Sequence, residues 1–330
     1  MKSILVTGGA GFIGSHVCEA LLNRDYQVIS IDSFNDFYDP RRKRRNIEEI
    51  KAVAASRRAE NSFISVEGDI RDRGCLEKLF ATYKPEAVIH LAAYAGVRPS
   101  IQNPVLYTDV NISGTVNLLE CLKDHRVRYH VFASSSSVYG NNKKVPFSEN
   151  DIVDFPISPY AATKKSGELL CHTYHHLYGI NTACLRFFTV YGPRQRPDLA
   201  IHKFAGLMTQ GLPVPLYGDG STQRDYTFIA DIIDGVVKSL EWTFSADKKY
   251  EVFNLGESQT ISLAQMVATL EKVTGLKAVL DHQPRQPGDV DCTYADISKA
   301  KAMLGYNPVT SFEAGVAAFV SWYKKNNAIF

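Results

Sequence analysis

The sequence predicts an α/β protein with a doubly wound parallel sheet and a smaller, mixed α/β C-terminal domain. Three observations carry this prediction. Short apolar runs alternate with helical patterns through the first 180 residues, a glycine-rich turn follows the first run, and acidic or small residues close the later runs. Strands that alternate with helices at this spacing favour parallel pairing, with a ligand site across the carboxyl ends of the strands.

The composition is ordinary for a globular protein, and it favours neither a nucleic-acid nor a membrane partner. Of the 330 residues, 45% are hydrophobic and 22% are charged, and the net charge is only +2. No run reaches the ~20 apolar residues of a membrane span, and the chain enters its first strand without a signal region. The six cysteines form no CxxC pair, so we expect a reducing, cytoplasmic location.

A glycine-rich turn joins the first strand, Ile4-Leu5-Val6, to a helix. Gly9, Gly11 and Gly14 form a GxGxxG pattern in the strand–turn–helix context that this pattern requires. Glycine lets the backbone turn tightly and approach a pyrophosphate, whose charge then lies at the helix N-terminus. The turn therefore predicts a Rossmann arrangement that binds a dinucleotide.

The second strand, Gln27 to Ile31, ends at Asp32, which lies 18 residues after Gly14. A carboxylate at this place accepts hydrogen bonds from ribose hydroxyls and repels a 2′-phosphate, which predicts NAD rather than NADP. The basic run Arg41 to Arg45 could instead hold a 2′-phosphate. We favour a solvated loop or helix start as the interpretation of that run.

The next strands repeat the pattern. Phe63 to Val66 leads to Asp69 and Ile70, and Ala87 to Ala93 closes on small residues where a backbone can pass close to a cofactor. His90 lies in that run, and we expect it to be a core residue and not a catalytic one. A helix follows from about Val105 to Leu122 and carries Asn111 near its start, and Tyr129 to Ala133 is the next strand.

Tyr160 and Lys164 lie four residues apart on the helix that follows, so they share a face one turn apart. A phenol ionises near pH ~10, and a nearby positive charge lowers its pKa. The pair can therefore make a general base, although the spacing alone also suits a solvated helix face. Four serines, Ser134 to Ser137, end the preceding strand, and the pattern does not say which of them acts.

With these motifs the chain resembles the extended short-chain dehydrogenase/reductase family, in its nucleotide-sugar epimerase branch, over nearly its whole length. Gly8, Gly11 and Gly14 match the GxxGxxG of that family, and Tyr160 with Lys164 matches its YxxxK. The resemblance implies a tightly bound NAD that is not consumed and a homodimer formed by the helices near 105–122 and 160–178. It also implies that Ser135 completes a catalytic set with Tyr160 and Lys164.

The resemblance divides the chain into an NAD-binding Rossmann domain, 1–180, and a mainly UDP-sugar-binding domain, 181–330, from which about 229–257 returns to the first. The expected cofactor-binding residues are Gly8, Gly11, Phe12, Ile13, Gly14, Asp32, Asn35, Asp69, Ile70, Leu91, Ala92, Ala93, Asn111, Tyr160, Lys164 and Phe187. The expected substrate-binding residues are Arg98, Ser135, Ser136, Thr189, Arg196, Tyr217, Arg224, Arg285 and Asp289.

Residues next to the catalytic set help to choose within the family. Dehydratases that resemble this pattern carry Asp-Glu just before VYG, and UDP-glucuronate decarboxylases usually carry Glu, whereas this chain has Ser136 and Ser137. Galactose-type epimerases usually have Asn where Thr189 stands, and the form here looks more like UDP-glucuronate 4-epimerases. Arg196 could form a two-pronged pair with a C6 carboxylate, unless it lies on a solvated loop.

The sequence therefore predicts an NAD-dependent 4-epimerase that converts UDP-glucuronate to UDP-galacturonate by oxidation at C4, rotation of the 4-keto sugar and re-reduction. The alternatives are a UDP-glucose/UDP-galactose 4-epimerase and a non-catalytic, NAD-binding regulator. Intact Ser135, Tyr160 and Lys164 argue against the regulator. His172, His175 and His176 have metal-compatible spacing, but no carboxylate motif accompanies them, so no metal site is expected.

Overall fold

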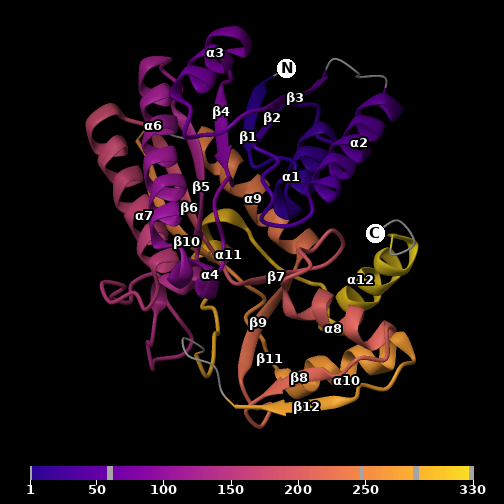
Figure 1. The fold of residues 1–330 in the computed structure, drawn as a ribbon. Coiled ribbons are helices and arrows are strands. Elements are labelled where there is room, and N and C mark those ends of the chain that lie inside the picture. Colours follow the sequence, from indigo (N-terminus) through magenta and orange to yellow (C-terminus); the bar gives the residue numbers. More distant parts are fainter. Residues whose placement is uncertain (1, 58–61, 246–247, 285–289, 327–330) are drawn as a thin grey trace.

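A seven-stranded, wholly parallel sheet forms the centre of the molecule (Figure 1). The computed structural model describes residues 2–57, 62–245, 248–284 and 290–326. The strand order is β10-β6-β5-β4-β1-β2-β3. The strands are β1 (Ser3–Thr7), β2 (Gln27–Asp32), β3 (Phe63–Glu67), β4 (Ala87–His90), β5 (Tyr129–Ser135), β6 (Asn181–Phe187) and β10 (Tyr250–Leu255). This order is the doubly wound arrangement that the sequence predicts.

Helices cover both faces of this sheet. One face carries α1 (Phe12–Leu22), α2 (Pro40–Ser56) and α9 (Ile229–Phe244), and the other carries α3 (Arg73–Tyr83), α6 (Gly114–Asp124) and α7 (Pro159–Tyr178). Successive residues of one strand serve opposite cores, since Ile4 and Val6 pack with the first set of helices and Leu5 with the second. Burial on both faces explains why the strands are almost continuously apolar.

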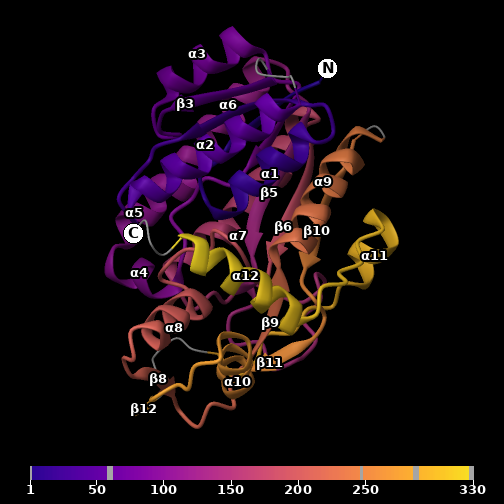
Figure 2. The ribbon, with the colours of Figure 1, turned by 90° about the vertical axis from the view of Figure 1, so that its right-hand side faces the viewer.

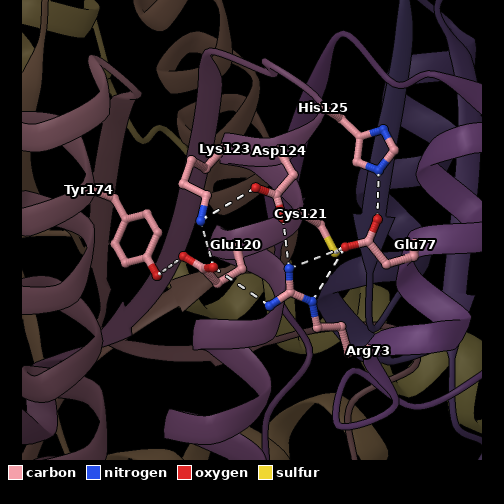
Figure 3. Close-up of polar contacts among 8 residues, drawn as sticks. All are labelled: Arg73, Glu77, Glu120, Cys121, Lys123, Asp124, His125 and Tyr174. Carbon is pink, nitrogen blue, oxygen red and sulfur yellow. Dashed lines mark hydrogen bonds and ion pairs between the residues drawn. The ribbon is translucent and has the colours of Figure 1, made fainter.

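On the second face a polar network joins α3 to α6 and α7 (Figure 3). Arg73 on α3 pairs with Asp124 on α6, with 2.7 Å between Nη2 and Oδ2, and also reaches Glu77 of its own helix. Tyr174 on α7 donates its hydroxyl to Glu120 on α6 at 2.7 Å. These side chains are partly exposed, so each ion pair adds little stability, and the apolar layer beneath them holds the helices together.

The helix that the sequence predicts from about Val105 to Leu122 is present but is not regular. It begins as α5 (Pro104–Thr108), passes through a π-helical turn at Asp109–Ser113 and continues as α6. Asn111 lies in the π-helical turn. Such turns often occur at functional sites, because the inserted residue changes the direction of a side chain.

The smaller domain is built from two short sheets and their covering helices. One sheet contains β7 (Thr189–Tyr191), β9 (Gln223–Phe228) and β11 (Thr260–Ser262), and the other contains β8 (Val214–Tyr217) and β12 (Leu280–Gln283). The helices are α8 (Ala200–Thr209), α10 (Leu263–Thr274) and α12 (Phe312–Asn326). Figure 2 shows α8, α10 and the short sheets at the end of the molecule opposite α3. The remaining helices are α4 (Val97–Gln102), the 3₁₀ turn η3 (Ser136–Tyr139) and α11 (Ser298–Leu304).

The chain crosses between the domains later than the predicted boundary at residue 180. Strand β6, residues 181–187, is wholly buried in the large sheet between β5 and β10. The segment from 229 to 257 contains α9 and β10, which pack on or pair within the same sheet. A short apolar run has the same sequence pattern in either domain, so the strands that pair with it determine the domain to which it belongs. Within the described residues, no helix is long and apolar enough to cross a membrane.

Candidate active site

A cleft of about 400 Å³ opens where the strands of the large sheet end. Its lining includes every expected cofactor-binding residue except Asn111, and it also includes Ser135, Ser136, Thr189 and Arg196 from the expected substrate set. Parallel strands carry their carboxyl ends to one edge of a sheet, so motifs far apart in the sequence meet there. The volume suits a small-molecule or cofactor site.

The glycine turn forms one wall of the cleft with no side chain in the way. Gly8 has a φ of +69°, and a Cβ on it would lie 2.9 Å from the backbone of Ala92. A Cβ on Gly14 would collide with the carbonyl oxygen of Gly8. The N-cap of α1 is Gly11, which has no side chain to cap the helix, so the first N–H groups of α1 remain available to an anion in the cleft.

Asp32 lies in the cleft at the end of β2 and is held by the backbone. Its carboxylate accepts hydrogen bonds from the N–H of Phe34 at 2.9 Å and of Ala10 at 3.2 Å. Lys43 approaches it with 3.5 Å between Nζ and Oδ1 and donates to Asn35 at 3.0 Å. These contacts hold the Asp32 carboxylate at the place where the ribose of a dinucleotide is expected.

The position of Lys43 corrects the expectation that the basic run is only a solvated helix start. The run does begin α2, and Arg41 and Arg44 are exposed, but Lys43 is buried and lines the cleft. The helical spacing could have predicted that Lys43 is buried, because Lys43 lies on the same face of α2 as the buried Ile47, Ile50 and Ala54.

Helix α7 positions Tyr160 and Lys164. Ser158 caps it by accepting from the N–H of Ala161, and proline occupies its first turn. Both Tyr160 and Lys164 line the cleft, and the Lys164 ammonium lies 5.9 Å from the centre of the Tyr160 ring. That ammonium donates to the carbonyl oxygen of Ala133 at 2.8 Å. The pair therefore shares one face, as the spacing predicts.

The pKa of Tyr160 does not move in the direction expected from its spacing to Lys164 alone. Burial raises it, while a hydrogen bond with Ser135 and the charge of Arg196 act in the opposite sense. Burial also lowers the pKa of Lys164 to about 8. Desolvation disfavours the charged form of each residue, and at Tyr160 it outweighs the opposing effects of Ser135 and Arg196.

The structure separates the four serines. Ser134 donates to Glu168 at 2.6 Å, and Glu168 is paired with Arg186 at 2.8 Å inside the protein. Ser135 faces the other way, where its side chain contacts Tyr160 and lies 3.1 Å from the hydroxyl of Ser137. All four serines line the cleft, so the difference between Ser134 and Ser135 lies in their side-chain partners. The turn from β5 into η3 makes this division, which four identical residues cannot reveal.

Asn111 lies behind the wall of the cleft and not on it, contrary to the expectation of a direct cofactor ligand. Its buried side chain accepts from the N–H of Tyr94 at 2.9 Å and donates to the carbonyl oxygen of the same residue at 3.0 Å. It also donates to Thr163 at 3.0 Å. Asn111 thereby ties the loop after β4 to the turn of α7 that carries Tyr160 and Lys164.

Arg196 reaches the cleft from the loop after β7, while Thr189 enters it at the start of that strand. The Arg196 side chain is 17% exposed, pairs with Asp198 and lies 5.1 Å from the centre of the Phe37 ring. Its charge acts on Tyr160. The solvated-loop alternative is therefore wrong for Arg196, because its side chain is mostly buried and its charge acts on Tyr160.

Arg98, Tyr217 and Arg224, the other predicted substrate residues within the described part of the chain, do not line this cleft. Arg98 on α4 stacks over Tyr217 at the end of β8, with 5.6 Å from its guanidinium to the ring centre. Arg224 on β9 donates to the carbonyl oxygen of Gln223 at 2.8 Å. Arg285 and Asp289 lie outside the described residues.

Two of the three histidines of α7 contact other residues of the protein, and His176 is exposed. His172 packs edge-on against Tyr250 with 5.0 Å between ring centres, and His175 lies 3.0 Å from the carbonyl oxygen of Ile180. His90 is a core residue as expected, because it bonds Thr7 at 2.7 Å and is 2% exposed.

The fold and the cleft define an extended short-chain dehydrogenase/reductase. The GDP-mannose 4,6 dehydratase family matches residues 5–319, and the chain belongs to that family. Among its relatives is a UDP-glucuronate 4-epimerase from Thermodesulfobacterium geofontis, which is 45% identical over 327 residues that cover 99% of this chain and 97% of the relative.

Solved structures agree over the whole chain. The UDP-glucuronic acid 4-epimerase from Bacillus cereus, in complex with UDP-glucuronic acid and NAD, is 38% identical with a TM-score of 0.87, and the match covers 98% of this chain and 99% of that one. The UDP-glucose 4-epimerase from Thermotoga maritima, with UDP-glucose, is 33% identical with the same TM-score and the same coverage.

Proposed function

We propose that this protein is an NAD-dependent UDP-glucuronate 4-epimerase, which interconverts UDP-glucuronate and UDP-galacturonate. One observation carries the proposal: Ser135, Tyr160 and Lys164 share a cleft with Arg196, at the mouth of a glycine turn built for a dinucleotide. The relatives and solved structures of the same name and length support it.

The residues present suit NAD. The uncapped start of α1 offers N–H groups to a pyrophosphate, and the close contact of Gly8 with Ala92 leaves the backbone bare where the phosphates pass. Asp32 suits the ribose hydroxyls, and the Lys43 ammonium beside it partly balances its negative charge. Bound NAD supplies the oxidant and reductant for the C4 hydrogen, and it stays bound because it ends each cycle unchanged.

The protein itself moves one proton. The Tyr160 phenol oxygen takes the proton of the C4 hydroxyl as C4 is oxidised, while Ser135 hydrogen-bonds the same oxygen. The carbonyl oxygen of Ala133 holds the Lys164 ammonium 5.9 Å from the centre of the Tyr160 ring, where its charge favours the phenolate against the effect of burial. After the 4-keto sugar rotates to present its other face, Tyr160 returns the proton to the oxygen at C4.

The glucuronate carboxylate needs its own site. The 4-keto intermediate is a β-keto acid, which loses CO₂ when the bond between C5 and C6 aligns with the carbonyl π system. Arg196 and Thr189 enter the cleft beside Tyr160 and are the groups that we assign to this carboxylate. Their contacts hold the C5–C6 bond out of alignment and so suppress decarboxylation.

Residues of the smaller domain complete the substrate site in this proposal. We assign Arg224 to the diphosphate, and Tyr217 to the nucleotide together with Arg98, which stacks on it from α4 of the large domain. Arg285 and Asp289 belong to the same expected set. These assignments rest on the family resemblance and on the arginine–phosphate chemistry.

A UDP-glucose 4-epimerase is the second candidate, because a structure of that name matches the whole chain. Purified protein incubated with UDP-glucuronate and with UDP-glucose, without added cofactor, separates the candidates when products are identified by NMR. We expect UDP-galacturonate from the first substrate at the higher rate. Preference for UDP-glucose would favour the second candidate, and no product even with added NAD would favour a non-catalytic regulator.

The cofactor is tested separately by denaturing the protein and identifying the nucleotide that it releases. We expect NAD(H), because the Asp32 carboxylate repels a 2′-phosphate. Recovery of mainly NADP(H) would refute this choice and would show that Lys43 and the rest of the basic run serve as a phosphate site.

We further propose that the protein is a homodimer that acts in the cytoplasm and supplies an acidic sugar nucleotide to polysaccharide biosynthesis. Val105, Leu169 and Leu177 are 77%, 57% and 59% exposed on α5 and α7, and these apolar side chains suit a partner copy. All six cysteines are free thiols, which suits a reducing compartment. Light scattering at micromolar concentration tests the dimer, and a monomer there would contradict it.

A further inference from the structure

The Arg196 guanidinium is held along one edge only. Its Nε donates to Oδ1 of Asp198 at 3.0 Å and its Nη2 donates to Oδ2 at 2.8 Å, a two-pronged pair. Among the residues that the structure describes, the hydrogen bonds of this guanidinium go to Asp198 alone. A guanidinium has five N–H donors in one plane, so its Nη1–Nη2 edge can receive a second carboxylate.

The loop that carries this pair is anchored on both sides of Arg196. The carbonyl oxygen of Pro193 bonds His16 on α1 at 3.0 Å, and Arg194 pairs with Glu19 on the same helix at 2.6 Å. Gln195 is 2% exposed and bonds the backbone of Val190. These contacts fix the loop to the cofactor-binding helix α1 and to β7.

The anchoring continues past Arg196. The N–H of Leu199 donates to the Arg196 carbonyl oxygen at 3.2 Å, and α8 begins directly afterwards. Asp198 is therefore held at a set distance from the arginine that it contacts. The ring of Phe37 lies 5.1 Å from the guanidinium carbon. Together they leave the long side chain little freedom to rotate.

We propose that Asp198 is a positioning residue for the acidic sugar: it holds Arg196 by its Nε–Nη2 edge, so that the adjacent Nη1–Nη2 edge meets the C6 carboxylate in a fixed plane. The inference deepens the proposed function and rests on UDP-glucuronate as substrate. Asp198 touches neither the cleft nor the reacting atoms, and it acts only through Arg196.

The role has a chemical consequence that a purely structural role lacks. When the guanidinium pivots, the carboxylate turns with it and the C5–C6 bond can align with the 4-keto group. That bond then breaks, its electron pair enters an enolate, CO₂ leaves and C5 takes a proton from water. The product is UDP-4-keto-pentose, and the two electrons removed from C4 remain on the reduced cofactor.

Asp198→Asn tests the proposal, because the amide keeps the shape but cannot accept from both Nε and Nη2. We expect turnover of UDP-glucuronate to fall by about tenfold, the cost of one charge-assisted contact, and the share of UDP-4-keto-pentose to rise. Reduced cofactor, followed by its near-ultraviolet absorbance, should accumulate with that product. Affinity for UDP-glucose, measured by calorimetry, should stay unchanged, and Asp198→Glu should restore part of the loss.

Asp39→Asn is the matched control. Asp39 and Arg41 also form a two-pronged pair two residues apart, but the pair is solvent-exposed and does not line the cleft. Asparagine also caps helices well, so α2 should keep its start. We expect this variant to match the wild type in rate and in product partition.

Three results would overturn the role of Asp198. The first is an Asp198→Asn variant with wild-type rate and no decarboxylated product. The second is an equal loss of affinity for UDP-glucose and UDP-glucuronate, which would indicate a general effect on the fold. The third is the same leakage from Asp39→Asn. A wild type that does not act on UDP-glucuronate would instead overturn the proposed function, and this proposal with it.

Discussion

The two halves of the molecule differ in how directly a motif becomes part of a site. In the half built on the large sheet, the predicted cofactor-binding residues from Gly8 to Phe187 meet in one cleft, with Asn111 alone set behind its wall, and of the predicted substrate residues in this half Arg98 lies outside the lining. In the smaller half, Thr189 and Arg196 reach that cleft, while Tyr217 and Arg224 lie outside its lining. A parallel sheet brings all its strand ends together, whereas short sheets with separate loops impose no such convergence.

The largest effect should come from the half where the residues converge. Tyr160→Phe keeps the ring and removes the oxygen that carries the proton, so we expect kcat to fall by about 10²–10⁴. The cofactor content and the thermal unfolding temperature should stay close to those of the wild type. Steady-state turnover and the nucleotide released on denaturation measure both. Near-normal turnover would remove Tyr160 from the mechanism.

Arg196→Ala tests whether Arg196, which reaches the cleft from the smaller half, determines the specificity for UDP-glucuronate over UDP-glucose. Loss of a charge-assisted contact costs about 1.5–3 kcal/mol, or about 10–150-fold against UDP-glucuronate. UDP-glucose has no carboxylate and should lose much less. The variant should also release UDP-4-keto-pentose, which NMR product analysis detects. Equal losses on both sugars would mean that Arg196 holds the diphosphate or the fold.

Arg224→Ala tests the smaller half on its own. If Arg224 meets the diphosphate, the variant should lose about tenfold in affinity for UDP, measured by calorimetry. The loss should be the same for UDP-glucuronate and UDP-glucose, because both carry the diphosphate. Unchanged affinity for UDP would show that the loops around Arg98 or beyond Arg224 hold the phosphates.

The smallest effect should come from Lys43→Met, which keeps the length of the side chain and removes its charge. Lys43 contacts Asn35 and approaches Asp32 in the cleft, so we expect NAD affinity to fall by about 3- to 10-fold. Arg44→Met is the matched control, since Arg44 belongs to the same run but is exposed and pairs with Glu67 at 3.4 Å. If both variants lose NAD affinity equally, the loss comes from the reduced positive charge of the protein and not from a contact of Lys43.

Some of the candidate site was predictable because local patterns limit three-dimensional choices. A GxGxxG pattern between a strand and a helix predicts a dinucleotide-binding turn, and Tyr160 and Lys164 share a helix face because they lie four residues apart. The strand ends could be ordered as one edge of a sheet without knowing any contact. Other features depended on contacts across many residues. Lys43 enters the cleft only because α2 packs on the sheet, and Asn111 is drawn away from it by Tyr94 and Thr163.

The sequence by itself determined the class of this protein: a doubly wound sheet, a dinucleotide turn, an acid at the end of β2 and a tyrosine–lysine pair on one helix face. Only the tertiary structure decided which serine faces Tyr160, that β6 belongs to the large sheet, and that Arg196 is gripped by Asp198. The physical reason is range. Turn geometry and helical spacing act over a few residues, whereas burial, strand pairing and the pKa of Tyr160 depend on partners far along the chain.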